Sequence, residues 1–230
     1  MRLRFLVALG TAFSCSLAYG QAPTETQSGT YMGRAVKLYA PKLDQYDSAP
    51  GEPNASICVD GPPQRQCYDA PKGFYRYPSV SKVQISKDVL AMFFSASTYG
   101  VSGFAIHHAL LVRSKMGDAL DNLFASETDT SPQSEDGFWN VPVVSDFKIF
   151  VTADYVWGPD ECHTCPHRYL ISAYVMTKTT ELTEGSAYYL DDRYMTLRTY
   201  NVGMKASILQ SEKAEIIARL GKIKAARQKK

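Results

Sequence analysis

The stretch DFKIFVTADYVWGPDECHTCPHRYLISAYVMT, residues 146–177, decides the fold class because it holds two alternating segments joined by a polar one. In the first segment one face carries Phe147, Ile149, Val151, Ala153, Tyr155 and Trp157. In the second segment one face carries Tyr169, Ile171, Ala173 and Val175. A period of two is typical of β-strands with one buried face. Because Gly158-Pro159 and Cys165-Pro166 interrupt the pattern between them, we predict a long β-hairpin with an elaborated tip.

Other apolar segments extend this β pattern along the chain. Strands are predicted at residues 83–85, 90–97, 102–112 and 192–200. A short helix is predicted at residues 118–125, and Leu209, Ile216, Leu220 and Ile223 recur at helical spacing near the C-terminus. Strands joined by turns rather than by helices favour a mainly β fold. We therefore predict an antiparallel β-sandwich or partial barrel with a short helix and a C-terminal amphipathic helix.

The N-terminus has the pattern of a secretory signal peptide. Arg2 and Arg4 precede the apolar run FLVALGTAF, and Ala18 and Gly20 provide small residues before a cut at Gln21. An acylated Cys15 is the alternative, although Phe13 beside it fits a lipoprotein signal poorly. No other run approaches the about 20 apolar residues that a membrane helix needs. The sequence thus predicts a protein that is exported to the periplasm or secreted.

Composition divides the remaining chain into three parts. Residues 21–33 are small and polar and are predicted to form a flexible leader. Residues 34–203 are expected to form a single β-rich domain, in which residues 41–78 are rich in Pro and Gly and are predicted to be irregular. Residues 204–230 are expected to form the C-terminal helix with a basic tail.

Charge argues against a nucleic-acid partner. The chain has 25 basic and 23 acidic residues, and removal of Arg2 and Arg4 with the signal peptide makes the two numbers equal. A neutral chain lacks the broad basic surface of a nucleic-acid-binding domain. The basic tail, residues 222–230, is the one segment that could contact an anionic surface.

The four cysteines that follow the signal peptide are predicted to form disulfides. An even number of cysteines in an oxidising compartment favours this interpretation. The candidates are Cys58, Cys67, Cys162 and Cys165, and three pairings of four cysteines are possible. Pairing of neighbours would pin the irregular segment and brace the hairpin tip, whereas cross-pairing would join the two.

A zinc site is the alternative interpretation of the hairpin tip. Its candidate ligands are Cys162, His163, Cys165 and His167. Four ligands so close in sequence can hardly close a tetrahedron alone, so a second pair would have to come from Cys58 and Cys67 or from one of two adjacent histidines. Those histidines, His107 and His108, point to opposite faces of a predicted strand. His108 is expected to be a hydrogen-bonded core residue, and His107 to be exposed or half-buried.

Aromatic residues mark a candidate recognition segment. Tyr68, Phe74, Tyr75, Arg76 and Tyr77 fall in the predicted irregular region. Exposed tyrosine beside arginine is common at binding surfaces, although the same rings could instead pack over a sheet edge.

Function is predicted from these features together. No serine-hydrolase elbow, phosphate loop or EF-hand is present. We interpret the chain as an exported, disulfide-stapled β protein that binds an extracellular or envelope ligand or protein, with no cofactor and no catalysis. The alternative is a zinc-dependent enzyme or metal-binding protein that uses the segment Cys162–His167.

Overall fold

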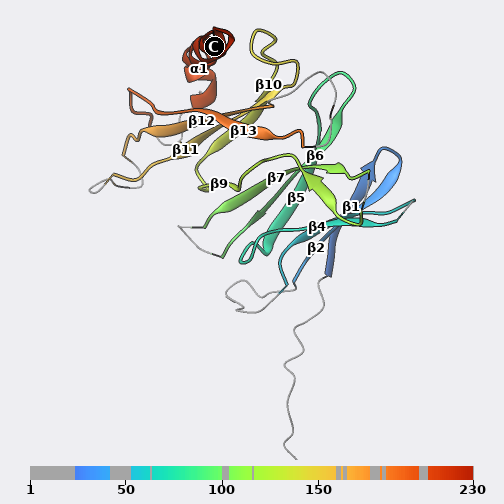
Figure 1. Ribbon diagram of the computed structural model, residues 1–230. Helices are drawn as coiled ribbons and strands as arrows, with labels where there is room; N and C mark the ends of the chain where they lie inside the picture. The colour runs from blue at the N-terminus through green and yellow to red at the C-terminus, as the bar shows by residue number, and fades with distance from the viewer. Residues whose placement is uncertain are drawn as a thin grey trace, which may run out of the picture.

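The structure, a computed structural model, is mainly β. It describes residues 24–41, 53–62, 64–99, 104–115, 117–158, 162, 165–176, 182, 185–201 and 207–229. The predicted signal peptide, Cys15 and His163 lie outside these residues. The described residues form three antiparallel sheets and one C-terminal helix (Figure 1). Among the described residues, no helix is both long enough and apolar enough to span a bilayer.

Sheet A comes from the N-terminal part of the chain and has the strand order β1-β2-β3-β4. Its strands are β1 (Thr24–Tyr31), β2 (Arg34–Ala40), β3 (Ser56–Val59) and β4 (Gln66–Asp69). A two-residue turn joins β1 to β2, and both of its residues have positive φ, 48° at Met32 and 75° at Gly33. Two positive φ values are typical of the type I′ turn, whose twist matches that of a hairpin.

Sheet B has the order β5-β6-β7-β8, and β9 pairs with β7 on the same side as β8. Its strands are β5 (Arg76–Gln84), β6 (Leu90–Ser97), β7 (Ile106–Arg113), β8 (Leu120–Asn122) and β9 (Thr128–Thr130). Strands β6 and β7 carry apolar residues on both faces, because sheet B lies between the other two sheets.

Sheet C contains the stretch that predicted the fold class. Its strands, in order, are β10 (Glu135–Trp139), β11 (Ile149–Tyr155), β12 (Tyr169–Met176) and β13 (Tyr188–Met195). Strands β11 and β12 pair directly, from Phe150 opposite Tyr174 to Tyr155 opposite Tyr169. The predicted hairpin is therefore confirmed.

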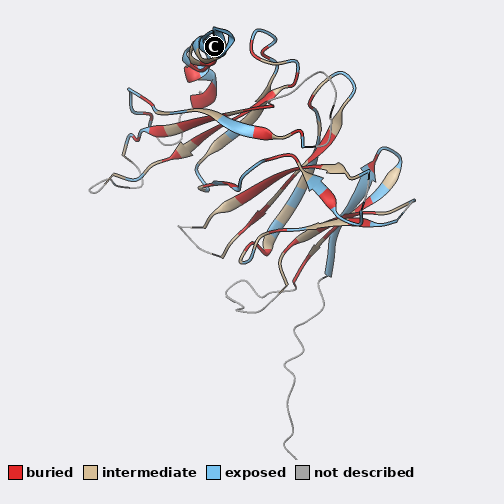
Figure 2. Ribbon diagram, in the orientation of Figure 1, coloured by how far each residue is buried: buried red, intermediate tan, exposed pale blue. Residues whose placement is uncertain are grey.

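The layers follow the order sheet A, sheet B, sheet C and helix α1 (Ile208–Gln228) (Figure 1). One apolar cluster fills the space between A and B, and another, rich in Phe, fills the space between B and C. A third lies between C and α1 and contains the alternating faces of β11 and β12. Figure 2 shows buried residues along the inner strands, whereas β1 is exposed along most of its length. The predicted sandwich is confirmed, with one more layer than two sheets provide.

Helix α1 is held on sheet C by its first turn and by its charged side chains. The Glu135 carboxylate accepts hydrogen bonds from the backbone N–H groups of Ile208 (2.9 Å) and Leu209 (3.0 Å). This satisfies donors that a helix leaves free at its N-terminus. Arg219 donates to both carboxylate oxygens of Asp192, at 2.6 and 2.9 Å.

The basic tail also contacts sheet C and the β10–β11 connection. Arg227 pairs with Asp191, and the Lys224 ammonium donates to the Val143 carbonyl oxygen (3.1 Å). Two of the cations at residues 222–230 therefore already have partners. Contact of the tail with an anionic surface stays a prediction.

The strand predicted at residues 192–200 is β13, which covers residues 188–195, and the one predicted at 83–85 is the end of β5, which begins at Arg76. Three further segments differ from the sequence prediction in the kind of element they form. Residues 24–31, part of the predicted leader, form β1, which shows no hydrophobic alternation because all of its residues except Tyr31 are exposed. The predicted irregular region 41–78 contains the short strands β3 and β4. The predicted helix at 118–125 is β8 and a turn. There Leu120 faces the A–B layer and Phe124 the B–C layer, so their spacing reflects two cores and not one helical face.

Candidate binding site

The cysteines pair as neighbours, which is one of the three pairings that the sequence allowed. Cys58 is bonded to Cys67 (S–S 2.10 Å) and Cys162 to Cys165 (2.06 Å). Cys58 and Cys67 lie directly opposite each other on β3 and β4. The Cys67 backbone N–H turns away from β3 and donates to the Asp118 carbonyl oxygen (3.2 Å). The first disulfide therefore joins two strands at the place where sheet A meets sheet B.

At the hairpin tip, His167 is wholly buried. Its Nε2 lies 2.9 Å from the Cys162 carbonyl oxygen and also contacts the Tyr155 hydroxyl. A carbonyl oxygen only accepts hydrogen bonds, so Nε2 carries the hydrogen in this arrangement. Across the part of the chain that is described, no three His, Cys, Asp or Glu side chains gather as a metal site. Because His163 is outside that part, the zinc hypothesis stays a prediction.

The candidate aromatic segment is divided between core and surface. Phe74 and Tyr75 are buried, as the alternative of packing over a sheet edge implies. The Arg76 guanidinium lies over the ring of Tyr99, 4.7 Å from its centroid. Tyr77 is 75% exposed and has a positive φ of 48°, at an irregularity in the pairing of β5 with β6. The five residues therefore do not converge on one surface.

Tyr68 belongs to a cluster centred on His107, and Phe74 joins the same cluster with its ring centroid 5.3 Å from that of His107. The His107 Nδ1–H donates to the Asp129 carboxylate (2.8 Å), and its Nε2 accepts from the Tyr68 hydroxyl (2.9 Å). His107 is buried, so the expectation of an exposed or half-buried residue is wrong. Burial, together with smaller contributions from the charges of Asp129, Glu127 and Asp69, raises the pKa of Tyr68 to about 12. A phenol this weakly acidic is a poor nucleophile at neutral pH, so the cluster serves best as a link between β4, β7 and β9.

His108 points to the opposite face of β7, as the alternation predicts. Its Nε2 lies 2.9 Å from the Thr130 hydroxyl, and its ring stacks on Phe93 at 5.2 Å between centroids. The pKa of His108 is lowered to about 4. Burial is the main cause and the charge of His107 a smaller one, while Asp129 acts in the opposite direction. The prediction of a hydrogen-bonded core histidine agrees with this geometry.

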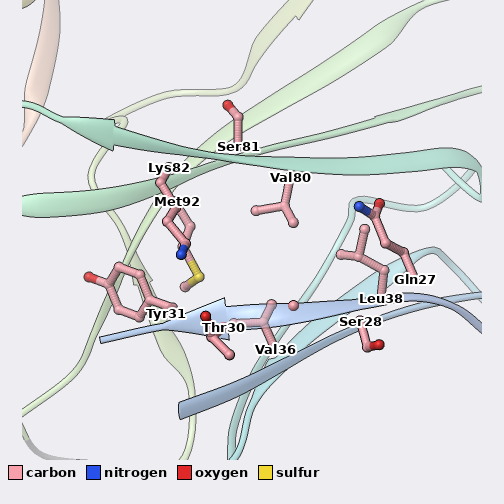
Figure 3. A pocket seen from close by; sticks show the side chains of 11 residues that line it. Gln27, Ser28, Thr30, Tyr31, Val36, Leu38, Val80, Ser81, Lys82 and Met92 are labelled. Carbon is pink, nitrogen blue, oxygen red and sulfur yellow. The ribbon is translucent and has the colours of Figure 1, made fainter. Parts of the chain in front are cut away.

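A pocket of about 180 Å³ lies where sheets A and B are open to each other (Figure 3). It is lined by Gln27, Ser28, Gly29, Thr30, Tyr31, Val36, Leu38, Val80, Ser81, Lys82 and Met92. These residues come from β1 and β2 on one side and from β5 and β6 on the other. Among the described residues no ladder joins β1 to β5, and both strands end their sheets. The pocket therefore opens between two sheet edges.

The pocket exists because β1 contributes little bulk to the A–B core. Gln27 pairs with Leu38 and Gly29 with Val36, and since Leu38 and Val36 are buried, Gln27 and Gly29 share their inward face. A Cβ atom placed on Gly29 would meet no atom within 4 Å. The missing side chain leaves the hollow.

The pocket has an apolar lining and a polar rim. Apolar side chains line it from both sides, with Val36 and Leu38 on β2 across from Val80 on β5 and Met92 on β6 (Figure 3). The Tyr31 hydroxyl is already satisfied, because it donates to the Leu90 carbonyl oxygen (2.6 Å). Lys82 on the rim has an exposed side chain and forms no ion pair with any described residue. Such a site can hold an apolar group and attract a negative charge beside it.

Sequence reasoning missed this site because β1 carried no hydrophobic alternation. One signal was available: Met32-Gly33 between Tyr31 and Arg34 is a two-residue hairpin turn that places TETQSGTY opposite RAVKLYA. Comparisons with family models, with curated proteins and with solved structures found no match to this chain. Function must therefore be inferred from the geometry of the described residues.

Proposed function

We propose that this is an exported binding protein that holds an apolar group of its ligand in the pocket between β1 and β5, and that it is not an enzyme. The two disulfides support export, because such bonds persist in oxidising compartments. The signal pattern at residues 1–20 points the same way. The ligand would be extracellular or part of the cell envelope.

The hollow at Gly29 carries the proposal. A folded core is normally close-packed, and an apolar space of this kind is left unfilled at a cost in stability. Beside the hollow, Val36 and Leu38 of β2 and Met92 of β6 are apolar and buried. The gap is confined to one strand at the edge, where an external group can reach it.

Binding can be tested with benzene as the probe, since cavities of about 150 Å³ bind benzene. Methyl NMR spectra of the exported chain should show saturable shifts at Val80 and Met92. Gly29→Val should abolish these shifts by filling the hollow. Its matched control, Ala35→Val, places a valine on the exposed outer face of β2, at a residue that does not line the pocket, and should keep them. An unshifted wild type, or equal shifts in both variants, would contradict the proposal.

Export has a separate test. Protein expressed with its own leader in a bacterial host should be recovered outside the cytoplasm with Gln21 as its first residue, by mass spectrometry. A lipid on Cys15 would show the anchored form instead. Recovery of the intact chain from the cytoplasm with four free thiols would contradict export.

A further inference from the structure

The strand that forms one wall of the pocket also has a free outer edge. Residues 24–30 of β1 are exposed, and β1 pairs only with β2 among the described elements. The N–H and C=O groups that point away from β2 therefore form an unpaired row, which is a template for another strand.

The neighbouring edge strand, β5, is protected against such pairing. Pro78 removes a donor from β5, and the pairing with β6 is irregular between Arg76 and Ser79. The charged Lys82 blocks it further. From Gln27 to Thr30, β1 has none of these features. Its own pairing irregularity, between Glu25 and Gln27, lies near the strand start, and its one charged residue, Glu25, is paired with Lys37 at 3.2 Å. An added strand would therefore pair with the free edge of β1 and not with that of β5.

The hollow is sized for one side chain. Its volume of about 180 Å³ is below the about 300 Å³ at which pockets begin to hold drug-sized ligands, and close to that of a cavity that takes benzene. Side chains directly opposite on paired strands have Cβ atoms about 5 Å apart, and a large side chain can cover a glycine on the neighbouring strand. A residue opposite Gly29 on an added strand would therefore reach into the hollow.

We propose, on the basis of the binding function above, that the ligand is an extended polypeptide segment that adds to the outer edge of β1. One apolar side chain of the segment, opposite Gly29, enters the pocket. A carboxylate of the segment lies near Lys82, the rim cation without a partner among the described residues. The backbone ladder supplies affinity and the pocket supplies selectivity.

The test uses a fluorescent octapeptide of threonines with leucine at its centre and glutamate two residues later. Anisotropy should show saturable binding to the exported chain, unchanged by Ala35→Val and weakened about tenfold or more by Gly29→Val. Two further peptides carry N-methyl groups on every second backbone nitrogen, one at the odd positions and one at the even positions. One of them should lose binding and the other should keep it, because only every second N–H of the added strand faces β1. Lys82→Gln should weaken the glutamate peptide about two- to fivefold and leave a glutamine peptide unchanged.

The outcomes separate the two proposals. If benzene enters the pocket but the peptide does not bind, or binds whichever set of nitrogens is methylated, strand addition is wrong and the binding function stands. If benzene fails as well, both are wrong. A concentration-dependent dimer that Gly29→Val abolishes would show that β1 pairs with a second copy of the chain, which also overturns the proposed partner.

Discussion

Sheets A and B form a sandwich with two ends. Among the described residues, their edge strands are joined to each other at one end and are not joined at the other. At the β4–β8 end, the sheets are joined by a parallel bridge between Cys67 and Ala119 and by the side chain of Gln66. The Gln66 amide donates to the carbonyl oxygens of Ser114 (3.0 Å) and Gly117 (2.9 Å), and its oxygen accepts from Arg113 Nε (3.0 Å). We call this the closed edge.

At the β1–β5 end, which we call the open edge, another glutamine occupies the inward face. Gln27 is exposed, and Gly29 beside it leaves the hollow. A glutamine whose hydrogen bonds are all supplied by protein closes a sheet edge, whereas one that faces water leaves the edge open to a ligand. The difference shows that edge closure here depends on a few polar contacts and not on strand composition.

Replacing each of the two glutamines by leucine should give the largest difference in stability between the two edges. Gln66→Leu should lower the free energy of unfolding by about 2–3 kcal/mol, because it leaves the part-buried carbonyl groups of Ser114 and Gly117, and the Arg113 guanidinium, without that partner. Gln27→Leu should raise it by up to about 1 kcal/mol, because it adds apolar contact with Leu38. Urea unfolding measures both through the midpoint at constant slope. Equal losses at the two positions would show that the edges are equivalent.

The disulfide at the closed edge should have the next largest effect. Cys58→Ala with Cys67→Ala should cost about 2–3 kcal/mol by chain-entropy arguments. The control pair, Cys162→Ala with Cys165→Ala, closes a ring with a separation of 3 instead of 9 residues and should cost about 2 kcal/mol or less. Thermal unfolding gives both values. Because β3 and β4 lie away from the pocket, the first pair should leave benzene binding intact; a loss of binding would show that the two edges are coupled.

Acid should weaken the molecule at the B–C layer and spare the open edge. The pKa of His108 is lowered to about 4 in the folded state, so the unfolded chain binds more protons between that value and about 6.5. This contribution to stability is complete above pH 6.5 and falls as the pH drops, by about 2 kcal/mol from pH 7 to pH 5.

The control for the pH effect is His108→Gln, which keeps a donor for Thr130 and does not titrate. Its unfolding free energy should depend less steeply on pH over the same range. Benzene affinity at pH 5.5 should match that at pH 7 in the wild type, because no histidine or carboxylate is among the described lining residues of the pocket. An unchanged slope in the variant would mean that His108 does not govern the pH dependence.

The fold could be predicted where hydrophobic alternation survives in the strands. Strand β6 was predicted to the residue, β12 to within one residue and β11 to within three, because at least one face of each is buried in an apolar layer. The closed edge was predicted only as a disulfide, because Gln66 gains its role from distant carbonyl groups. The open edge was missed, because Gly29 acts through the absence of a side chain and a sequence pattern records only the side chains present.

The smallest effect concerns that glycine. Gly29→Val should raise the free energy of unfolding by about 1 kcal/mol, because it removes the entropy cost of a strand glycine and buries methyl groups against Val36. No strain opposes the change, since Gly29 does not have a positive φ and has open space around its Cβ position. The expected rise in the melting temperature is about 2–4 °C. Ala35→Val, at an exposed residue of β2 that does not line the pocket, should change it by less. The opposite result would be a Gly29→Val variant that is less stable than the wild type, although its methyl spectra without ligand are otherwise like those of the wild type. That result would show that the hollow is smaller than a valine side chain. The open edge would then be closed by packing, as the other edge is by hydrogen bonds.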